Sequence, residues 1–389
     1  MRNVISDKVI GLAPSGIRKF FDIVSEMDDV ISLGVGEPDF DTPWHIRDEG
    51  IYSLEKGRTF YTSNSGLKEL RKEICRYLKR RCNLDYRLEE TLITVGGSEA
   101  IDLAMRVLLN PGDEVLIPQP SFVSYLPCAV LADGVPVVIN LKAENEFRLT
   151  AKELEDAITD KTKLLVLPFP NNPTGAVMTR EDLEAISEVI IRHDIYVLSD
   201  EIYSELTYSG DHVSIASLPG MKERTITMNG FSKSFAMTGW RLGYACGPTE
   251  IIAQMTKVHQ FAIMCAPTNS QYAAVEALKN GDGDVAEMRE AYNGRRRFLL
   301  HAFKEMGLPC FEPLGAFYAF PCIKEFGMTS EEFASRLLKE EKVAVVPGSA
   351  FGECGEGYLR ISYAYSLEDL KKALDRIADF VKRLKSEAK

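Results

Sequence analysis

The chain has 389 residues, of which 46 are Lys or Arg and 57 are Asp or Glu, so its formal net charge at pH 7 is −11. This length predicts two or three domains, and the acidic balance argues against a surface that binds the phosphodiester backbone of nucleic acid. The sequence contains no apolar run long enough to span a bilayer and no signal peptide at its start, so we expect a cytoplasmic protein.

Strand-like and helix-like segments alternate over most of the chain. The first 45 residues have no regular pattern and include the turn-rich stretch GEPDFDTP at 36–43. Short apolar runs predict strands at 92–95, 114–118, 135–141, 164–169, 195–200, 225–231 and 241–247. Amphipathic patterns predict helices at 66–82, 98–109 and 180–193, the last capped by Thr179. This alternation predicts an α/β fold, a three-layer α/β/α domain with a mostly parallel central sheet.

The pattern changes after about residue 285 and predicts a smaller α+β domain. Its expected helices lie at 284–307, 330–340 and 367–386, and its expected strands at 316–321, 343–348 and 358–365. We expect the first 45 residues to pack on this domain. The predicted division is therefore an N-terminal arm and part of the small domain at 1–45, a large domain at 46–284, and the rest of the small domain at 285–389.

The eight cysteines and five histidines are scattered along the chain. No two cysteines form a C-x-x-C pair, and no histidines have the spacing typical of a metal site. We therefore expect free thiols and no metal.

Residues suited to chemistry follow several of the predicted strands. Open α/β sheets bind ligands at the carboxyl ends of their strands, and the residues at these ends are Gly97, Ser98, Asn172, Asp200, Tyr203, Ser232, Lys233 and Arg241. A glycine-rich turn opening a helix suits a phosphate, and Arg241 offers a planar fork for the same group. A partly desolvated lysine attacks carbonyls, and Asp200 can pair with a cationic ring nitrogen.

Each of these residues alone has an ordinary structural explanation, as a connector, a helix cap or a solvated side chain. Together they require a ligand with a phosphate, a carbonyl and a ring nitrogen. Pyridoxal 5′-phosphate has all three, and it is held in proteins by a Schiff-base lysine and an acidic partner at its pyridine nitrogen.

Six stretches of the chain resemble the fold-type I, class I/II pyridoxal-phosphate aminotransferases. They are GEPDFDTP (36–43), NNPTG (171–175), SDEIYSELTY (199–208), NGFSKSFAMTGWRLGY (229–244), PGSAFG (347–352) and YLRIS (358–362). The stretches SGIRKFFDI (15–23), PSFVSY (120–125) and 343–364 are most similar to the branch with archaeal aromatic aminotransferases. Bacterial N-acetyl-diaminopimelate aminotransferases are a close second.

The resemblance implies a role for each matching residue. Lys233 would be the Schiff-base lysine and general base, and Asp200 would keep the pyridine nitrogen protonated. The other implied cofactor contacts are Tyr203 and Asn172 at the ring oxygen, Phe122 on the ring face, and Gly97, Ser98, Ser232 and Arg241 at the phosphate. Tyr61 would reach the phosphate in the neighbouring subunit of a homodimer with shared active sites. Arg360 would bind the substrate α-carboxylate, with Asn172 and the Gly36 backbone nearby.

The implied reaction is a ping-pong transfer of an amino group from an aromatic L-amino acid, or from L-amino acids broadly, to a 2-oxo acid such as 2-oxoglutarate. Aspartate or N-acetyl-diaminopimelate aminotransferase activity is the alternative, followed by a C–S lyase on the same scaffold. Two alternatives from other classes agree less well with the sequence. A DNA-binding regulator would need a basic N-terminal segment, and an inactive scaffold would not need Lys233.

Substrate choice depends on two further sets of residues. A dicarboxylate specialist needs a second cation, for which the candidates are Arg18, Lys19 and Arg58. An aromatic substrate would suit the aromatic set Phe20, Phe21, Phe122, Tyr125, Phe317 and Tyr318.

Overall fold

The computed structural model describes residues 4–13, 27 and 29–387. The candidate substrate residues Arg18, Lys19, Phe20 and Phe21 lie outside the described residues. No helix in the described part of the chain is long and apolar enough to cross a membrane.

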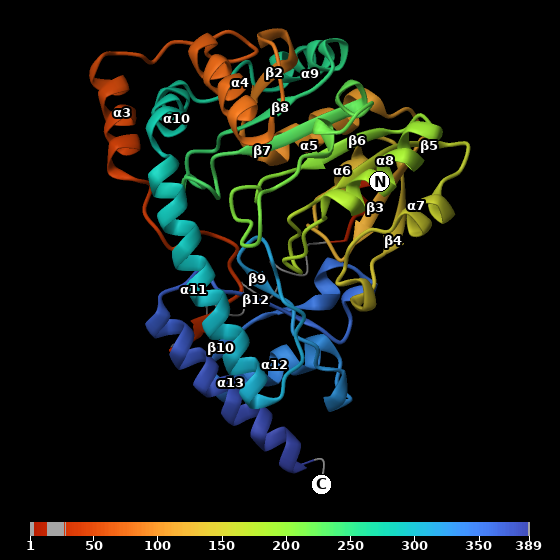
Figure 1. Cartoon of the computed structure of the whole chain (residues 1–389), viewed down its shortest axis with the longest axis vertical. Helices are drawn as coiled ribbons and strands as arrows, with labels where there is room; N and C mark the ends of the chain where they lie inside the picture. Colours follow the sequence, from red (N-terminus) through yellow and green to blue (C-terminus); the bar gives the residue numbers. More distant parts are fainter. Residues whose placement is uncertain (1–3, 14–26, 28, 388–389) are drawn as a thin grey trace.

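A seven-stranded sheet forms the centre of the larger part of the molecule (Figure 1). Its strands, in spatial order, are β2 (Thr91–Thr94), β8 (Gly243–Cys246), β7 (Thr225–Gly230), β6 (Tyr196–Asp200), β5 (Thr162–Leu167), β3 (Glu114–Gln119) and β4 (Val135–Asn140). All pairs are parallel except those of β8, which runs antiparallel to both β2 and β7. The predicted mostly parallel α/β sheet is confirmed.

Helices cover both faces of this sheet because alternate side chains of the buried strands point to opposite sides. On β5, Leu164 and Val166 pack into one hydrophobic cluster while Leu165 and Leu167 pack into another. The first cluster includes α5 (Gly96–Leu108), α6 (Tyr125–Leu131) and α9 (Thr249–Ala262), and the second includes α7 (Ala151–Ala157) and α8 (Arg180–Arg192). The hydroxyl of Thr179 accepts the N–H of Asp182 at 3.1 Å, so the predicted cap of α8 is confirmed.

Four more helices lie outside these two clusters. Three precede the central sheet in the chain, and one follows it. They are α1 (Asp7–Ile10), α3 (Trp44–Glu55), α4 (Lys68–Cys82) and α10 (Thr268–Asn280). Of these, only α4 follows from the sequence pattern. Helix α3 buries only Ile46, Gly50 and Ser53, so it has no apolar stripe that would have indicated it.

Segments from both halves of the chain meet in the smaller part of the molecule, at the bottom of Figure 1, whereas the N-terminus lies on the larger part, where Lys8 pairs with Asp133. Strand β1 (Ile31–Ser32) pairs in parallel with β10 (Val343–Ala344). Strand β12 (Leu359–Ser362) lies between β9 (Tyr318–Ala319) and β11 (Val346–Pro347), antiparallel to both. Helices α11 (Asp282–Met306), α12 (Ser330–Glu341) and α13 (Leu367–Glu387) complete this part.

One hydrophobic cluster joins these elements. It contains Leu33 from the N-terminal segment together with Phe333 of α12 and Phe380 of α13. Helix α11 begins beside α10 and runs down to α13 (Figure 1). We propose that the domain boundaries lie as the sequence predicts, near residue 45 and at the start of α11.

Candidate active site

A cavity of about 540 Å³ lies at the carboxyl ends of the central strands. The predicted site residues Gly36, Gly97, Ser98, Phe122, Asn172, Asp200, Tyr203, Ser232, Lys233, Arg241 and Arg360 all line it. Strand β7 ends at Gly230 and β8 begins at Gly243, and the two strands are antiparallel partners. The loop between them therefore leaves and re-enters the sheet at the same edge, which brings Lys233 and Arg241 to one cavity.

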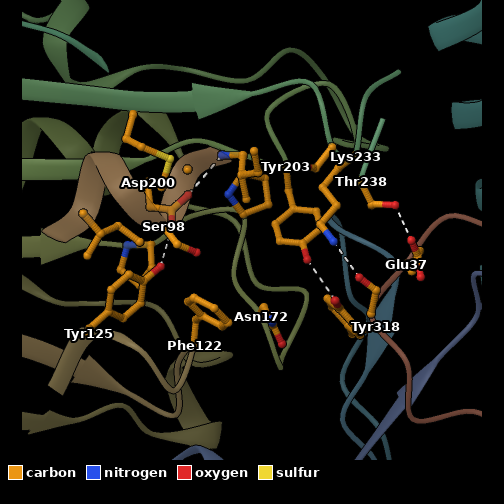
Figure 2. A pocket seen from close by; sticks show the side chains of 18 of the residues that line it. Glu37, Ser98, Phe122, Tyr125, Asn172, Asp200, Tyr203, Lys233, Thr238 and Tyr318 are labelled. Carbon is orange, nitrogen blue, oxygen red and sulfur yellow. Dashed lines mark hydrogen bonds between the residues drawn. The ribbon is translucent and has the colours of Figure 1, made fainter. Parts of the chain in front are cut away.

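Lys233 projects into this cavity from the loop after β7 (Figure 2). Its Nζ donates a hydrogen bond to the backbone oxygen of Gly36 at 2.5 Å. Burial and the nearby cations Arg360 and Arg241 lower the pKa of Lys233, the carboxylate of Glu37 opposes them, and the resulting pKa is about 8. The amine therefore becomes neutral, and nucleophilic, at a lower pH than an ordinary lysine does.

Asp200 is the last residue of β6 and is almost completely buried. The hydroxyl of Tyr125 donates to its Oδ2 at 2.6 Å, and the N–H of Ile202 donates to its Oδ1 at 3.2 Å. Burial raises the pKa of Asp200, these two hydrogen bonds oppose the rise, and the resulting pKa is about 6. Asp200 is thus mainly a carboxylate at pH 7, aimed into the cavity beside Ser98 (Figure 2).

Arg360, on β12, is buried on the opposite side of the cavity from the sheet. Its Nη1 donates to Asn172 Oδ1 at 2.9 Å, and its Nη2 donates to the backbone oxygen of Gly34. The guanidinium lies 4.6 Å from the ring centroid of Tyr318, and its Nε is buried with no hydrogen-bond partner among the described residues. A fixed, partly unsatisfied guanidinium of this kind is suited to a carboxylate.

Two tyrosines form the wall between Lys233 and Arg360. The hydroxyls of Tyr203 and Tyr318 lie 2.8 Å apart, as drawn in Figure 2. Burial raises the pKa of Tyr203, so its hydroxyl stays protonated. Gly36 runs against this pair so closely that a Cβ there would lie 2.2 Å from the Tyr318 hydroxyl, which explains the glycine.

The start of α5 and Arg241 form a cationic cradle at the other end of the cavity. Gly96 has a φ of +74°, and a Cβ on it would lie 2.6 Å from Nη2 of Arg241. Arg241 itself has a φ of +51° and donates from Nη1 to the Thr238 oxygen at 2.9 Å. Backbone N–H groups at a helix start, with an arginine and the hydroxyls of Ser98 and Ser232, suit a phosphate. With Lys233 and Asp200 in the same cavity, the residues fit pyridoxal phosphate.

Several residues lie apart from the predicted arrangement. Tyr61 is 80% exposed and does not line the cavity of its own chain. Its predicted contact with the phosphate in the neighbouring subunit stays a prediction. Arg58 pairs with Glu49 at 3.1 Å and lies over the ring of Tyr272, also outside the cavity. Phe317 is buried in the core of the smaller part.

The sequence did not indicate the polar contacts of four residues of the cavity, Glu37, Tyr125, Thr238 and Tyr318. Tyr125 was noted only as an aromatic residue, yet its hydroxyl holds Asp200. Glu37 and Thr238 bond to each other across the cavity mouth, Thr238 donating (Figure 2). Glu37 falls within the stretch at 36–43 and Thr238 lies between Lys233 and Arg241, so their position beside other site residues was the available signal.

The family model described as "Aminotransferase class I and II" matches residues 28–377. The chain belongs to this aminotransferase family. It is therefore an aminotransferase that uses pyridoxal phosphate and acts on amino acids and 2-oxo acids, as the resemblance implied.

Three similar proteins show how far the likeness to this family extends. A putative aminotransferase of Bacillus subtilis, YugH, is 53% identical over 98% of this chain and 99% of its own length. An aspartate aminotransferase of Pyrococcus abyssi is 49% identical over 98% of this chain and 99% of its own length. The crystal structure of an aromatic aminotransferase from Pyrococcus horikoshii superimposes with a TM-score of 0.90, at 48% identity over 94% of this chain and 99% of that one. Aminotransferases with different substrate names are thus about equally similar to this chain.

Proposed function

We propose that this aminotransferase transfers the amino group of an aromatic L-amino acid, or of L-amino acids broadly, to a 2-oxo acid such as 2-oxoglutarate. The composition of the cavity wall supports this. Among the described residues, the cavity holds no cation besides Lys233, Arg241 and Arg360, each of which has a role below. The remaining wall includes the rings of Phe122, Tyr125 and Tyr318. A dicarboxylate specialist would need one more cation.

The names of the similar proteins favour one further candidate, an aspartate aminotransferase. An N-acetyl-diaminopimelate substrate remains the third candidate because a Bacillus subtilis relative that is 44% identical carries that name. A C–S lyase is less well supported, since Arg360 is in place to hold a substrate carboxylate.

The proposed roles are those that the family resemblance implies, and the position of each group in the cavity supports them. When bound, pyridoxal phosphate supplies the aldehyde that accepts the amino group and the ring that withdraws electrons. Lys233 supplies the amine for covalent attachment and later carries the α-proton. Arg360 holds the α-carboxylate, with Asn172 and the Gly36 backbone beside it. Asp200 provides the negative charge for the ring nitrogen.

The remaining predicted residues orient the cofactor. Tyr203 and Asn172 would bond the ring oxygen, and Phe122 would stack on the ring. The phosphate would lie at the cradle formed by Gly97, Ser98, Ser232 and Arg241.

Steady-state kinetics with a panel of donors tests the substrate proposal. The panel is Phe, Tyr, Asp, Glu and an N-acylated diaminopimelate, each with 2-oxoglutarate as acceptor. We expect kcat/KM for Phe and Tyr to equal or exceed that for the other donors. A strong preference for Asp or for the acylated diamine would refute the aromatic or broad specificity.

The pH at which Lys233 becomes nucleophilic is a direct consequence of its lowered pKa. Only the neutral amine attacks an aldehyde, so a pKa of about 8 predicts that apoprotein captures pyridoxal phosphate faster as pH rises from 7 to 9. The rate should reach half its maximum near pH 8, as followed by stopped-flow absorbance. A midpoint near 10.5, the ordinary value for lysine, would contradict the arrangement of cations around Lys233.

An exposed apolar surface supports the proposed homodimer. Phe60, Tyr61 and Phe261 are each at least 80% exposed. Their segments are held together, because Thr268 bonds the Phe60 oxygen at 2.7 Å and Asn64 bonds the Met264 oxygen at 3.0 Å. Large exposed apolar side chains that lie close together are typical of an interface, and we propose that a second copy of the chain covers them and receives Tyr61.

Replacing Phe261 with glutamate should convert this dimer to monomer, because the interface would then bury an unpaired carboxylate. Light scattering should give twice the chain mass for the wild type and about half that value for Phe261→Glu. The matched control is Leu367→Glu, at another exposed apolar position that starts α13, which should remain dimeric. A monomeric wild type would refute the dimer proposal.

A further inference from the structure

Glu99, in the first turn of α5, is held on both of its oxygens. This helix presents Gly97 and Ser98 to the cavity, and the Glu99 side chain is only 10% exposed. Its Oε2 accepts the backbone N–H of Val95, the residue that precedes the helix. Its Oε1 lies 2.6 Å from Nδ1 of His259. The Glu99 carboxylate thus links Val95, which precedes Gly96 and Gly97, to His259, and so fixes the turn at the start of α5.

His259 is fully buried on α9, the helix that packs against α5. Because a carboxylate oxygen only accepts, Nδ1 carries the hydrogen of this bond. The other ring nitrogen, Nε2, is buried and has no hydrogen-bond partner among the described residues. An unsatisfied buried nitrogen is unfavourable. The hydrogen bond from Nδ1 to Glu99 therefore best explains why a histidine occupies this position.

We propose that His259 is a positioning residue for the phosphate of the cofactor. By holding Glu99, whose other oxygen accepts the Val95 N–H, it keeps the first turn of α5 in the geometry that aims the N–H groups of Gly97 and Ser98 into the cavity. It also holds the charge of Glu99 on two donors, so that this charge does not compete with the phosphate for the N–H groups of the cradle. The inference rests on the phosphate role proposed above for Gly97, Ser98 and Arg241.

Binding of pyridoxine 5′-phosphate to the full-length apoprotein isolates this effect. This compound has the phosphate and ring but no aldehyde, so its affinity does not depend on covalent attachment to Lys233. We expect His259→Leu to weaken binding about tenfold in a calorimetric titration. His259→Asn should stay within about threefold of the wild type, because the asparagine amide can place a donor where Nδ1 lies.

A double-mutant cycle separates positioning from a general loss of stability. Glu99→Ala should weaken binding by about as much as His259→Leu, and the double variant should bind no more weakly than either single variant. Full additivity of the two losses would overturn the proposal, as would wild-type affinity in folded His259→Leu. If His259→Leu does not fold, the comparison of His259→Asn with Glu99→Ala decides: equal losses would overturn it.

Two control variants complete the design. His45 also pairs with acidic residues, Glu276 and Asp284, but lies outside the cavity, so His45→Leu should leave the affinity unchanged. Arg241→Leu should weaken binding strongly if the cradle holds the phosphate. Unchanged affinity in Arg241→Leu would refute the proposed cradle itself, whereas a loss there without a loss in His259→Leu would refute only the role of His259.

Discussion

Replacement of Lys233 by alanine is expected to abolish transamination, with kcat reduced by at least about 10²–10⁴-fold. Loss of a general base alone accounts for a reduction of that size, and loss of the covalent attachment point adds to it. No other lysine lines the cavity among the described residues. The purified variant should also lack the yellow colour of a protein with covalently attached pyridoxal phosphate.

Borohydride reduction of the wild type, followed by peptide mass spectrometry, locates the attachment site independently of activity. The reduced cofactor should be found on the peptide that contains Lys233 and be absent from Lys233→Ala. The matched control is Lys152→Ala, whose lysine is on the surface of α7 and pairs with Asp156, and which should keep full activity and colour. Attachment at a different lysine would refute the assignment.

Replacement of Arg360 by lysine is expected to reduce kcat/KM for amino-acid donors by about 10²–10³-fold. Truncating one member of a buried, hydrogen-bonded charged pair costs about 2–5 kcal/mol. Lysine keeps the charge but loses the planar fork that reaches both Asn172 and the Gly34 oxygen. The substrate carboxylate would then lose its bidentate partner.

A donor without a carboxylate tests whether this loss arises at the proposed position. Phenethylamine lacks the α-carboxylate of phenylalanine, so its slow transamination should be nearly the same in Arg360→Lys and in the wild type. Equal losses for both donors would instead indicate general damage to the site. Thermal unfolding of the apoprotein checks that the variant is folded, and Arg383→Lys on the surface of α13 is the control that should leave both donors unaffected.

The central fold could be predicted because its strands are short, continuous apolar runs buried on both faces. Leu164 to Leu167 alternate between two cores, which makes the run apolar throughout. Helices α3 and α10 were missed because their buried positions include small or polar residues. In α10, for example, Ser270 and Gln271 are buried, so the apolar stripe is broken.

The predicted site residues were found through their position after strands, and the structure brings nearly all of them to one cavity. The contact between Tyr125 and Asp200 could not be predicted, because it depends on how the start of α6 lies against the end of β6. The antiparallel direction of β8 was not predicted either. That direction explains why Lys233 and Arg241, eight positions apart in the sequence, face the same ligand site.

The pairing of β1 with β10 has a consequence for how the protein is made. Ile31 pairs with Val343, so a segment synthesised at the start of translation has no partner until most of the chain has been produced. The central sheet, between β2 and β8, is completed earlier by residues up to Cys246. We therefore expect the sheet to fold first on the ribosome, while the apolar side chains of the segment around Leu33 stay exposed to solvent. During that interval the nascent chain would be most dependent on chaperones.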